Sequence, residues 1–186
     1  MKGKSVVFSL VFGLVLLAVA GFVYYQFKDV KILKTPMAEE QKLILFSPAF
    51  EHQGYILPEY TCDGENINPP LGIKNVSPEA KSLVLIVDDP DAPMGTWVHW
   101  VIFNLNPLID FIEPGKEPGG IVGLNSWGEA KYGGPCPPSG EHRYFFKLYA
   151  LDKELDLGHG ATKKDVVRTM EGHVLQSAEL IGRYKR

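Results

Sequence analysis

The chain has 186 residues, a formal net charge of −3, 45% hydrophobic residues and two cysteines. This is enough for one ordinary domain with a hydrophobic core plus a short extension, and it excludes a disordered chain, a collagen-like repeat and a disulfide-dense miniprotein. Residues 1–28 hold three lysines and no acidic residue, so the rest of the chain carries all 22 acidic side chains against 16 basic ones. An acidic body disfavours nucleic acid as a partner, so any anion site must be local.

The N-terminal segment has the character of a membrane span. Residues 5–27 are uncharged, rich in Val, Leu, Phe and Ala, and follow Lys2 and Lys4. About 20 such residues cross the hydrocarbon core of a bilayer. We therefore expect residues 1–28 to be a single-pass membrane anchor, residues 29–41 a polar stalk, and the body to lie outside the cytoplasm. The alternative is a cleaved signal peptide and a secreted protein, because Ala18-Val-Ala20 after an apolar segment matches a cleavage site.

Strand signals dominate the body, residues 42–186. Short runs of β-branched and aromatic residues, each closed by Pro, Gly, Asp or Asn, predict strands near 42–46, 82–87, 98–105 and 144–151. Thr162-Lys-Lys-Asp165 is a capping-box pattern, and apolar residues then recur at helical spacing, which predicts one C-terminal helix to about Tyr184. We therefore expect a mainly β fold with this helix packed on a sheet or sandwich.

Two segments concentrate chemically unusual residues. Residues 88–93 (DDPDAP) follow a predicted strand and lead to His99, while residues 133–144 contain several Pro and Gly and end beyond His142. A histidine on an apolar strand face is often a satisfied core residue, but it must otherwise find a ligand. Two of them beside rigid loops favour a pocket. By strict alternation, His99 shares a face with Trp97, Val101 and Phe103, and His142 with Tyr144, Phe146 and Leu148.

Several catalytic and metal-binding patterns are missing. The sequence has no calcium loop, P-loop, dinucleotide fingerprint or nucleophile elbow. Composition also allows a metal site of His99, His142 and Asp89, but no pair of histidines has close ligand spacing. Neither Ser126 nor Ser139 belongs to a local triad motif. We therefore expect binding rather than catalysis, with no metal and no cofactor.

At these motifs the chain resembles the phosphatidylethanolamine-binding protein family, in its bacterial and archaeal branch of Raf kinase inhibitor-like proteins. The resemblance rests on Asp89-Pro-Asp-Ala-Pro93, Trp97-x-His99, Gly134-Pro135 and Gly140-x-His-Arg-Tyr144. Residues 60–71 are also similar, so that the resemblance covers nearly all of residues 42–186.

The resemblance implies an antiparallel β-sandwich with flanking helices and one small pocket for an anionic head group such as phosphate or phosphoethanolamine. Asp91 and Arg143 would hold the two motif loops together, and backbone N–H groups near Gly134 would hold phosphate oxygens. Some family members inhibit serine proteases, so a protein-interaction module is the alternative function. The residues expected to line the pocket are Asp89, Ala92, Pro93, His99, Gly134, Pro135, His142 and Tyr144.

The resemblance also places Cys62 and Cys136, in two long loops, beside the same pocket. An exported location would let a disulfide between them persist, whereas a reducing compartment would keep both thiols free. Two small buried thiols are the alternative, because Cys is a common core residue. The separation of the two Cα atoms decides whether the bond can form.

Overall fold

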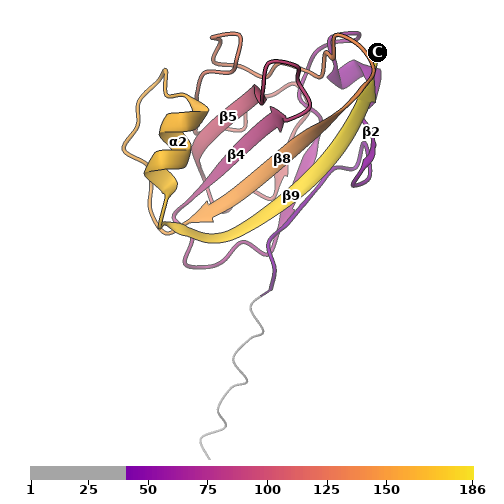
Figure 1. Ribbon diagram of the computed structural model, residues 1–186. Coiled ribbons are helices and arrows are strands. Elements are labelled where there is room, and N and C mark those ends of the chain that lie inside the picture. Colours follow the sequence, from indigo (N-terminus) through magenta and orange to yellow (C-terminus); the bar gives the residue numbers. More distant parts are fainter. Residues whose placement is uncertain (1–40) are drawn as a thin grey trace, which may run out of the picture. The chain divides into compact units, whose positions relative to one another are not determined.

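The computed structural model describes residues 41–186 (Figure 1). The predicted anchor, residues 1–28, and nearly all of the predicted stalk lie outside the described residues. Within residues 41–186, no helix combines the length and the apolar character that crossing a membrane requires.

Two β-sheets form the body. The larger sheet has six strands in the order β2-β9-β8-β4-β5-β7, and the smaller has three in the order β1-β3-β6. Neighbouring strands are antiparallel, except that β2 runs parallel to β9. The elements in chain order are β1 Ile44–Phe46, β2 Gly54–Tyr55, a 3-10 helix Pro58–Tyr60, β3 Leu71–Lys74, β4 Ser82–Asp89, β5 Trp97–Leu105, β6 Phe111–Ile112, β7 Ile121–Val122, β8 Glu141–Leu151, α2 Lys163–Met170 and β9 Val174–Lys185.

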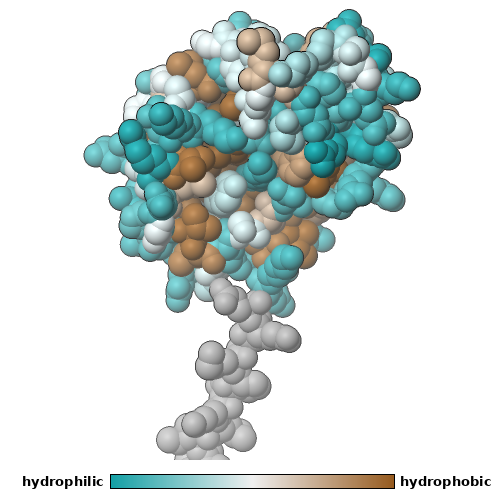
Figure 2. Space-filling view, viewed as in Figure 1, coloured by the Kyte–Doolittle hydropathy of each residue, from teal (hydrophilic) through white to brown (hydrophobic). Residues whose placement is uncertain are grey.

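The central strand β4 is buried on both faces, because each face has its own hydrophobic core. Leu83, Leu85 and Val87 belong to the core that includes the residues of the smaller sheet. Val84 and Ile86 point the other way, into a second core that α2 covers (Figure 1). On the face drawn in Figure 2, hydrophobic side chains form separate patches between hydrophilic ones. The mainly β expectation is confirmed, and the strand period of two assigns alternate residues of β4 to different cores.

The predicted C-terminal helix is wrong beyond its first turns. α2 begins at Thr162 with the expected capping box, but it ends at Met170. Gly172 follows in the left-handed region, at φ 79°, which is a common way to stop a helix. The chain then forms β9, which pairs with β8 along its whole length. In β9 the buried residues alternate with more exposed ones, as Leu180, Gly182 and Tyr184 show. The prediction missed this strand because other apolar residues in the segment recur at helical spacing.

Candidate ligand-binding site

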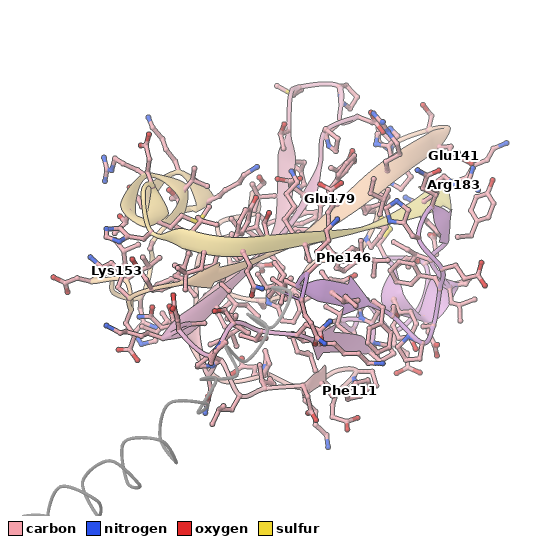
Figure 3. All side chains as sticks on the ribbon, turned by 90° about the horizontal axis from the view of Figure 1, so that it is seen from below. Phe111, Glu141, Phe146, Lys153, Glu179 and Arg183 are labelled. Carbon is pink, nitrogen blue, oxygen red and sulfur yellow. A yellow bond between two sulfur atoms is a disulfide. The ribbon has the colours of Figure 1, made fainter. Side chains whose placement is uncertain are left out.

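A pocket of about 420 Å³ opens where β4 ends and β5 begins. Figure 3 shows Glu141 and Arg183 side by side at one end of the molecule and Lys153 at the other. The pocket lies toward the Glu141 end, because its wall residue Asp89 is hydrogen-bonded to His142, which follows Glu141 in the chain. Most of the wall is apolar. The residues that line it are Asp89, Ala92, Pro93, Met94, Trp97, His99, Trp127, Cys136 and Pro138.

A β-bulge sets the direction of His99. Val87 of β4 opposes Trp100 and Asp88 opposes Val98, so His99 is the one residue of β5 left without a partner at this point. Such a bulge redirects a side chain, and it breaks the alternation on which the sequence prediction relied. Val101 and Phe103 lie in the core under α2. The His99 ring instead packs edge-on against Tyr144, with 5.2 Å between ring centroids, on the side of the sandwich interior.

The protonation of His99 follows from its partner. Its Nδ1 lies 2.7 Å from the carbonyl oxygen of Gly133, which can only accept, so Nδ1 carries a proton and donates it. The Gly133 N–H in turn donates to the His99 carbonyl at 3.0 Å. Burial lowers the pKa of the imidazole below its ordinary value, against the opposing effects of Gly133 and Asp89. In the neutral ring, Nε2 is the atom left for a ligand, and it is an acceptor.

His142 and Asp89 form a buried pair. The Nδ1 of His142 lies 2.7 Å from Oδ2 of Asp89, and the two residues are 7% and 3% exposed. Oδ1 of Asp89 accepts the backbone N–H of Asp91 at 2.8 Å. Both carboxylate oxygens are therefore engaged, and Asp89 acts here to orient His142. His142 shares its strand face with Tyr144 and Phe146, as expected, but His142 and Tyr144 do not line the pocket, contrary to our expectation.

Two buried side-chain donors in this region donate to no acceptor among the described residues. They are the indole Nε1 of Trp97, which lines the pocket, and the hydroxyl of Tyr144. Burial raises the pKa of the Tyr144 phenol well above its ordinary value, although the Cys136 backbone N–H, which approaches the phenol oxygen as a donor, opposes this. The hydroxyl therefore keeps its proton. Buried polar groups are nearly always paired in proteins, so these two donors are available to a ligand with acceptor atoms.

Asp91 and Arg143 brace the two motif loops, as the resemblance implied. Arg143 donates from Nε and Nη2 to the two oxygens of Asp91, at 2.8 and 2.7 Å, and its backbone N–H adds a third bond at 3.0 Å. Hydrogen bonding from Arg143 lowers the pKa of Asp91 to about 2, against a smaller opposing effect of burial. The loop after β4 is thereby fixed to the start of β8.

The loop at residues 133–136 is packed against the loop at residues 60–66. The Gly134 N–H donates to Oδ1 of Asn66 at 2.7 Å, so it is not free to hold a phosphate, contrary to our expectation. A Cβ at Gly134 would stand 2.6 Å from that oxygen and 2.7 Å from the Tyr60 carbonyl, which explains the glycine. Gly134 lines a neighbouring cavity of about 200 Å³ rather than the pocket, and Pro135 lines neither.

A disulfide joins the same two loops. Cys62 and Cys136 have their Cα atoms 5.4 Å apart, within the usual range for a bridge. The Cys62 N–H also donates to the Pro135 carbonyl at 3.1 Å. Cys136 lines both the pocket and the neighbouring cavity, so the bridge forms part of the wall between them.

The most important wall residue missing from the sequence prediction is Trp127. Its indole packs edge-on against both His99 and Trp97, with ring centroids 5.2 and 5.3 Å away. The preceding residue, Ser126, docks on β5, because its N–H donates to the Val98 carbonyl and its Oγ accepts the Val98 N–H. Nothing in the local sequence around Trp127 indicates this docking. Met94 and Pro138 were likewise not predicted, although both lie within or beside the recognised motifs.

The geometry defines a β-sandwich protein with a pocket beside the end of its central strand, and comparison with known proteins agrees on this fold. Residues 46–185 match the model of the family described as phosphatidylethanolamine-binding protein, and the chain belongs to that family. A UPF0098 protein of Methanothermobacter thermautotrophicus is 58% identical over 144 residues, which cover 74% of this chain and 95% of the relative.

Two solved structures support the same fold. The crystal structure of a phosphatidylethanolamine-binding protein homologue from Chlamydia trachomatis has 43% sequence identity and a TM-score of 0.76, covering 78% of this chain and 98% of that one. The structure of YbcL from E. coli, described as a new member of the mammalian family, has 26% identity and a TM-score of 0.73, covering 78% and 99%.

Proposed function

We propose that this protein binds, without chemically changing it, a small ligand whose oxyanion head group occupies the pocket at His99. Two unpaired buried donors carry the proposal: Trp97 Nε1, whose residue lines the same pocket as His99, and Tyr144 Oη, whose ring packs against the His99 imidazole. An oxyanion such as a phosphate supplies several acceptor oxygens at once, and hydrogen bonds to a charged partner are the strong ones.

The state of His99 refines the proposed head group. A neutral His99 offers an acceptor at Nε2, which fits a protonated phosphate oxygen, and a protonated His99 offers a donor, which fits an unprotonated one. Phosphate monoesters lose their second proton near pH 6, so both matched states gain population as the pH falls from 7 toward the interval between the pKa of the phosphate and that of His99. The low pKa of His99 moves the expected rise in affinity to a pH below 6.5, the ordinary value for histidine.

Binding is favoured over catalysis by what surrounds the histidines. Within residues 41–186, no Ser or Thr hydroxyl is bonded to His99 or His142, the arrangement that would activate a nucleophile. Ser126 Oγ accepts a backbone N–H from Val98, and Ser139 is exposed.

The cellular part of the proposal rests on sequence alone. We propose that residues 5–27 hold the domain at the membrane, outside the cytoplasm, so that its ligand is one found there. Cleavage of the domain by protease added to intact cells is the expected result, and protection until lysis would contradict it. Inhibition of a serine protease stays the alternative prediction, and a panel of such enzymes tests it.

Removing the unpaired donors one at a time tests the site. Trp97→Phe and Tyr144→Phe should each weaken phosphoethanolamine binding about tenfold, because each deletes one hydrogen bond to a charged group. Tyr144→Phe should not lower the free energy of unfolding by more than about 0.5 kcal/mol, because its hydroxyl donates to no partner in the free protein. Trp97→Phe should cost more, because it also removes part of the indole that packs against Trp127. Calorimetric titration and urea unfolding measure the two quantities.

Tyr132→Phe is the matched control. The Tyr132 hydroxyl is also buried but donates to the Tyr60 carbonyl at 3.0 Å. Its loss should therefore cost about 1 kcal/mol of stability and leave affinity within twofold. Unchanged binding in both Trp97→Phe and Tyr144→Phe would overturn the proposed site.

A further inference from the structure

The Cys62–Cys136 disulfide is reachable from a cavity that the proposed ligand site does not use. Both cysteines line the neighbouring cavity of about 200 Å³, together with Lys131, and both are only half-buried. A thiol group that enters this cavity meets the bridge directly, even when the rest of the molecule stays outside. A thiol is the class of molecule that reacts with a disulfide at such a contact.

The charges around the two sulfur atoms are unequal. Nη1 of Arg186 lies 3.4 Å from Sγ of Cys136, so a cation stands beside that sulfur. Cys62 is followed by Asp63, whose carboxylate accepts the Tyr184 hydroxyl at 2.7 Å and Nε of Arg186 at 3.0 Å. A guanidinium stabilises a thiolate and a neighbouring carboxylate does not, so Cys136 is the better leaving group of the pair.

We propose that this bridge is a site of thiol–disulfide exchange with small thiols, and that exchange occurs at Cys62. The thiolate of the incoming molecule attacks Sγ of Cys62, and a new sulfur–sulfur bond forms there. The bond between Cys62 and Cys136 breaks, and its electron pair leaves on Cys136 as a thiolate beside Arg186. Attack by Cys136 on the mixed disulfide reverses the step and releases the small thiol, so that no other oxidant or reductant is needed.

The two loops stay together when the bridge opens, because other bonds also hold them. The Cys62 N–H bonds to the Pro135 carbonyl, the Gly134 N–H to Asn66, and the Tyr132 hydroxyl to the Tyr60 carbonyl. The freed Cys136 therefore remains close to Cys62. Exchange at this site is accordingly reversible without unfolding, and it alters the wall that the pocket and the cavity share.

The test treats the oxidised full chain with millimolar glutathione, quenches with acid, alkylates the free thiols and maps the peptides by mass spectrometry. Glutathione should be found on Cys62 and the alkyl group on Cys136, and removing glutathione should restore the bridge. The same reaction in urea should give adducts at both cysteines, because the charges no longer surround them. Glutathione on Cys136, equal labelling in the folded protein, or no adduct at all would overturn the proposal.

Arg186→Gln tests the role of the guanidinium. Exchange should slow several-fold, because the Cys136 thiolate loses its guanidinium and a leaving thiol of higher pKa leaves more slowly. Arg186→Lys keeps the positive charge and should retain most of the rate. Arg183→Gln is the control, because Arg183 contacts Glu141 and the Gln53 carbonyl rather than a sulfur. Equal rates for Arg186→Gln and Arg183→Gln would contradict the assignment of Cys136 as the leaving group.

Discussion

Two adjacent carboxylates at the end of β4, Asp88 and Asp89, lie on opposite faces of the larger sheet and differ in what surrounds them. Asp88 is fully buried on the face that α2 covers, and its two oxygens bind the ammonium groups of Lys147 and Lys163. Asp89 faces the sandwich interior, where it binds His142 and the Asp91 N–H.

The difference lies in the donors that remain unused. Each oxygen of the Asp88 carboxylate is paired with one lysine ammonium group, and the Lys163 pair joins the first turn of α2 to the sheet. Around Asp89 the unpaired donors of Trp97 and Tyr144 remain. Two adjacent carboxylates thus have different surroundings: the buried ion network around Asp88 is saturated and stabilises the fold, and the polar network around Asp89 is incomplete and belongs to the proposed ligand site.

The largest expected effect comes from neutralising each carboxylate in turn. Asp88→Asn should lower the free energy of unfolding by roughly 3 kcal/mol, because it leaves two lysines without their buried counter-ion. Asp89→Asn should cost only about 1 kcal/mol, because His142 can change tautomer and accept from the new amide. Urea unfolding at pH 7 measures both. Equal losses would show that the two carboxylates do not differ in this way.

A second comparison sharpens the role of His99 through pH. Its pKa is lower in the folded protein than in the unfolded chain, so the unfolded chain binds more protons below about pH 6.5. The free protein should therefore lose stability as the pH falls below that value, by at most about 1.4 kcal/mol per unit of pKa shift. A bound oxyanion should reverse part of this loss.

His99→Asn removes the titrating ring and keeps a donor for the Gly133 carbonyl. Its stability should respond less to pH between 7 and 5, and ligand affinity should lose its rise in acid. Thermal unfolding across pH, with and without phosphate, makes the measurement. A parent protein whose stability rises as the pH drops would contradict the assigned direction.

The smallest effect is expected at the exposed brace. Asp91→Asn should cost less than about 1 kcal/mol, because the Arg143 side chain is 54% exposed and water screens the pair. The pKa of Asp91 is lowered to about 2, so this contribution is present above about pH 4 and is lost as the pH falls toward 2. The difference between parent and variant in acid unfolding checks it. A loss as large as that of Asp88→Asn would show a larger role for the brace.

The sequence was sufficient for the features that depend on local pattern. The strand period predicted β4, β5 and β8, and the capping box predicted the start of α2 at Thr162. The pairing of β8 with β9 was missed, because apolar residues from Val174 to Ile181 fit both a helical and a strand period. Gly172, in the left-handed region, was the local sign of the helix end.

The site was predicted only in part, because two of its features are properties of pairing. The bulge that turns His99 toward Tyr144 exists only between β4 and β5, and no single strand shows it. Trp127 reaches the wall only because its loop docks on Val98. The family resemblance located Asp89 and His99 in the pocket wall. It did not show that the Gly134 N–H already donates a hydrogen bond to the Asn66 side chain.

The pairing of β2 with β9 has a consequence for the speed of folding. Gly54 lies beside Gly182, so the edge of the larger sheet joins segments from opposite ends of the domain. β9 separates β2 from β8 in the sheet, and β2 can pair with β9 only after the whole chain between them has closed into one long loop. Folds dominated by such distant contacts fold in milliseconds to seconds, orders of magnitude more slowly than helical bundles of similar stability.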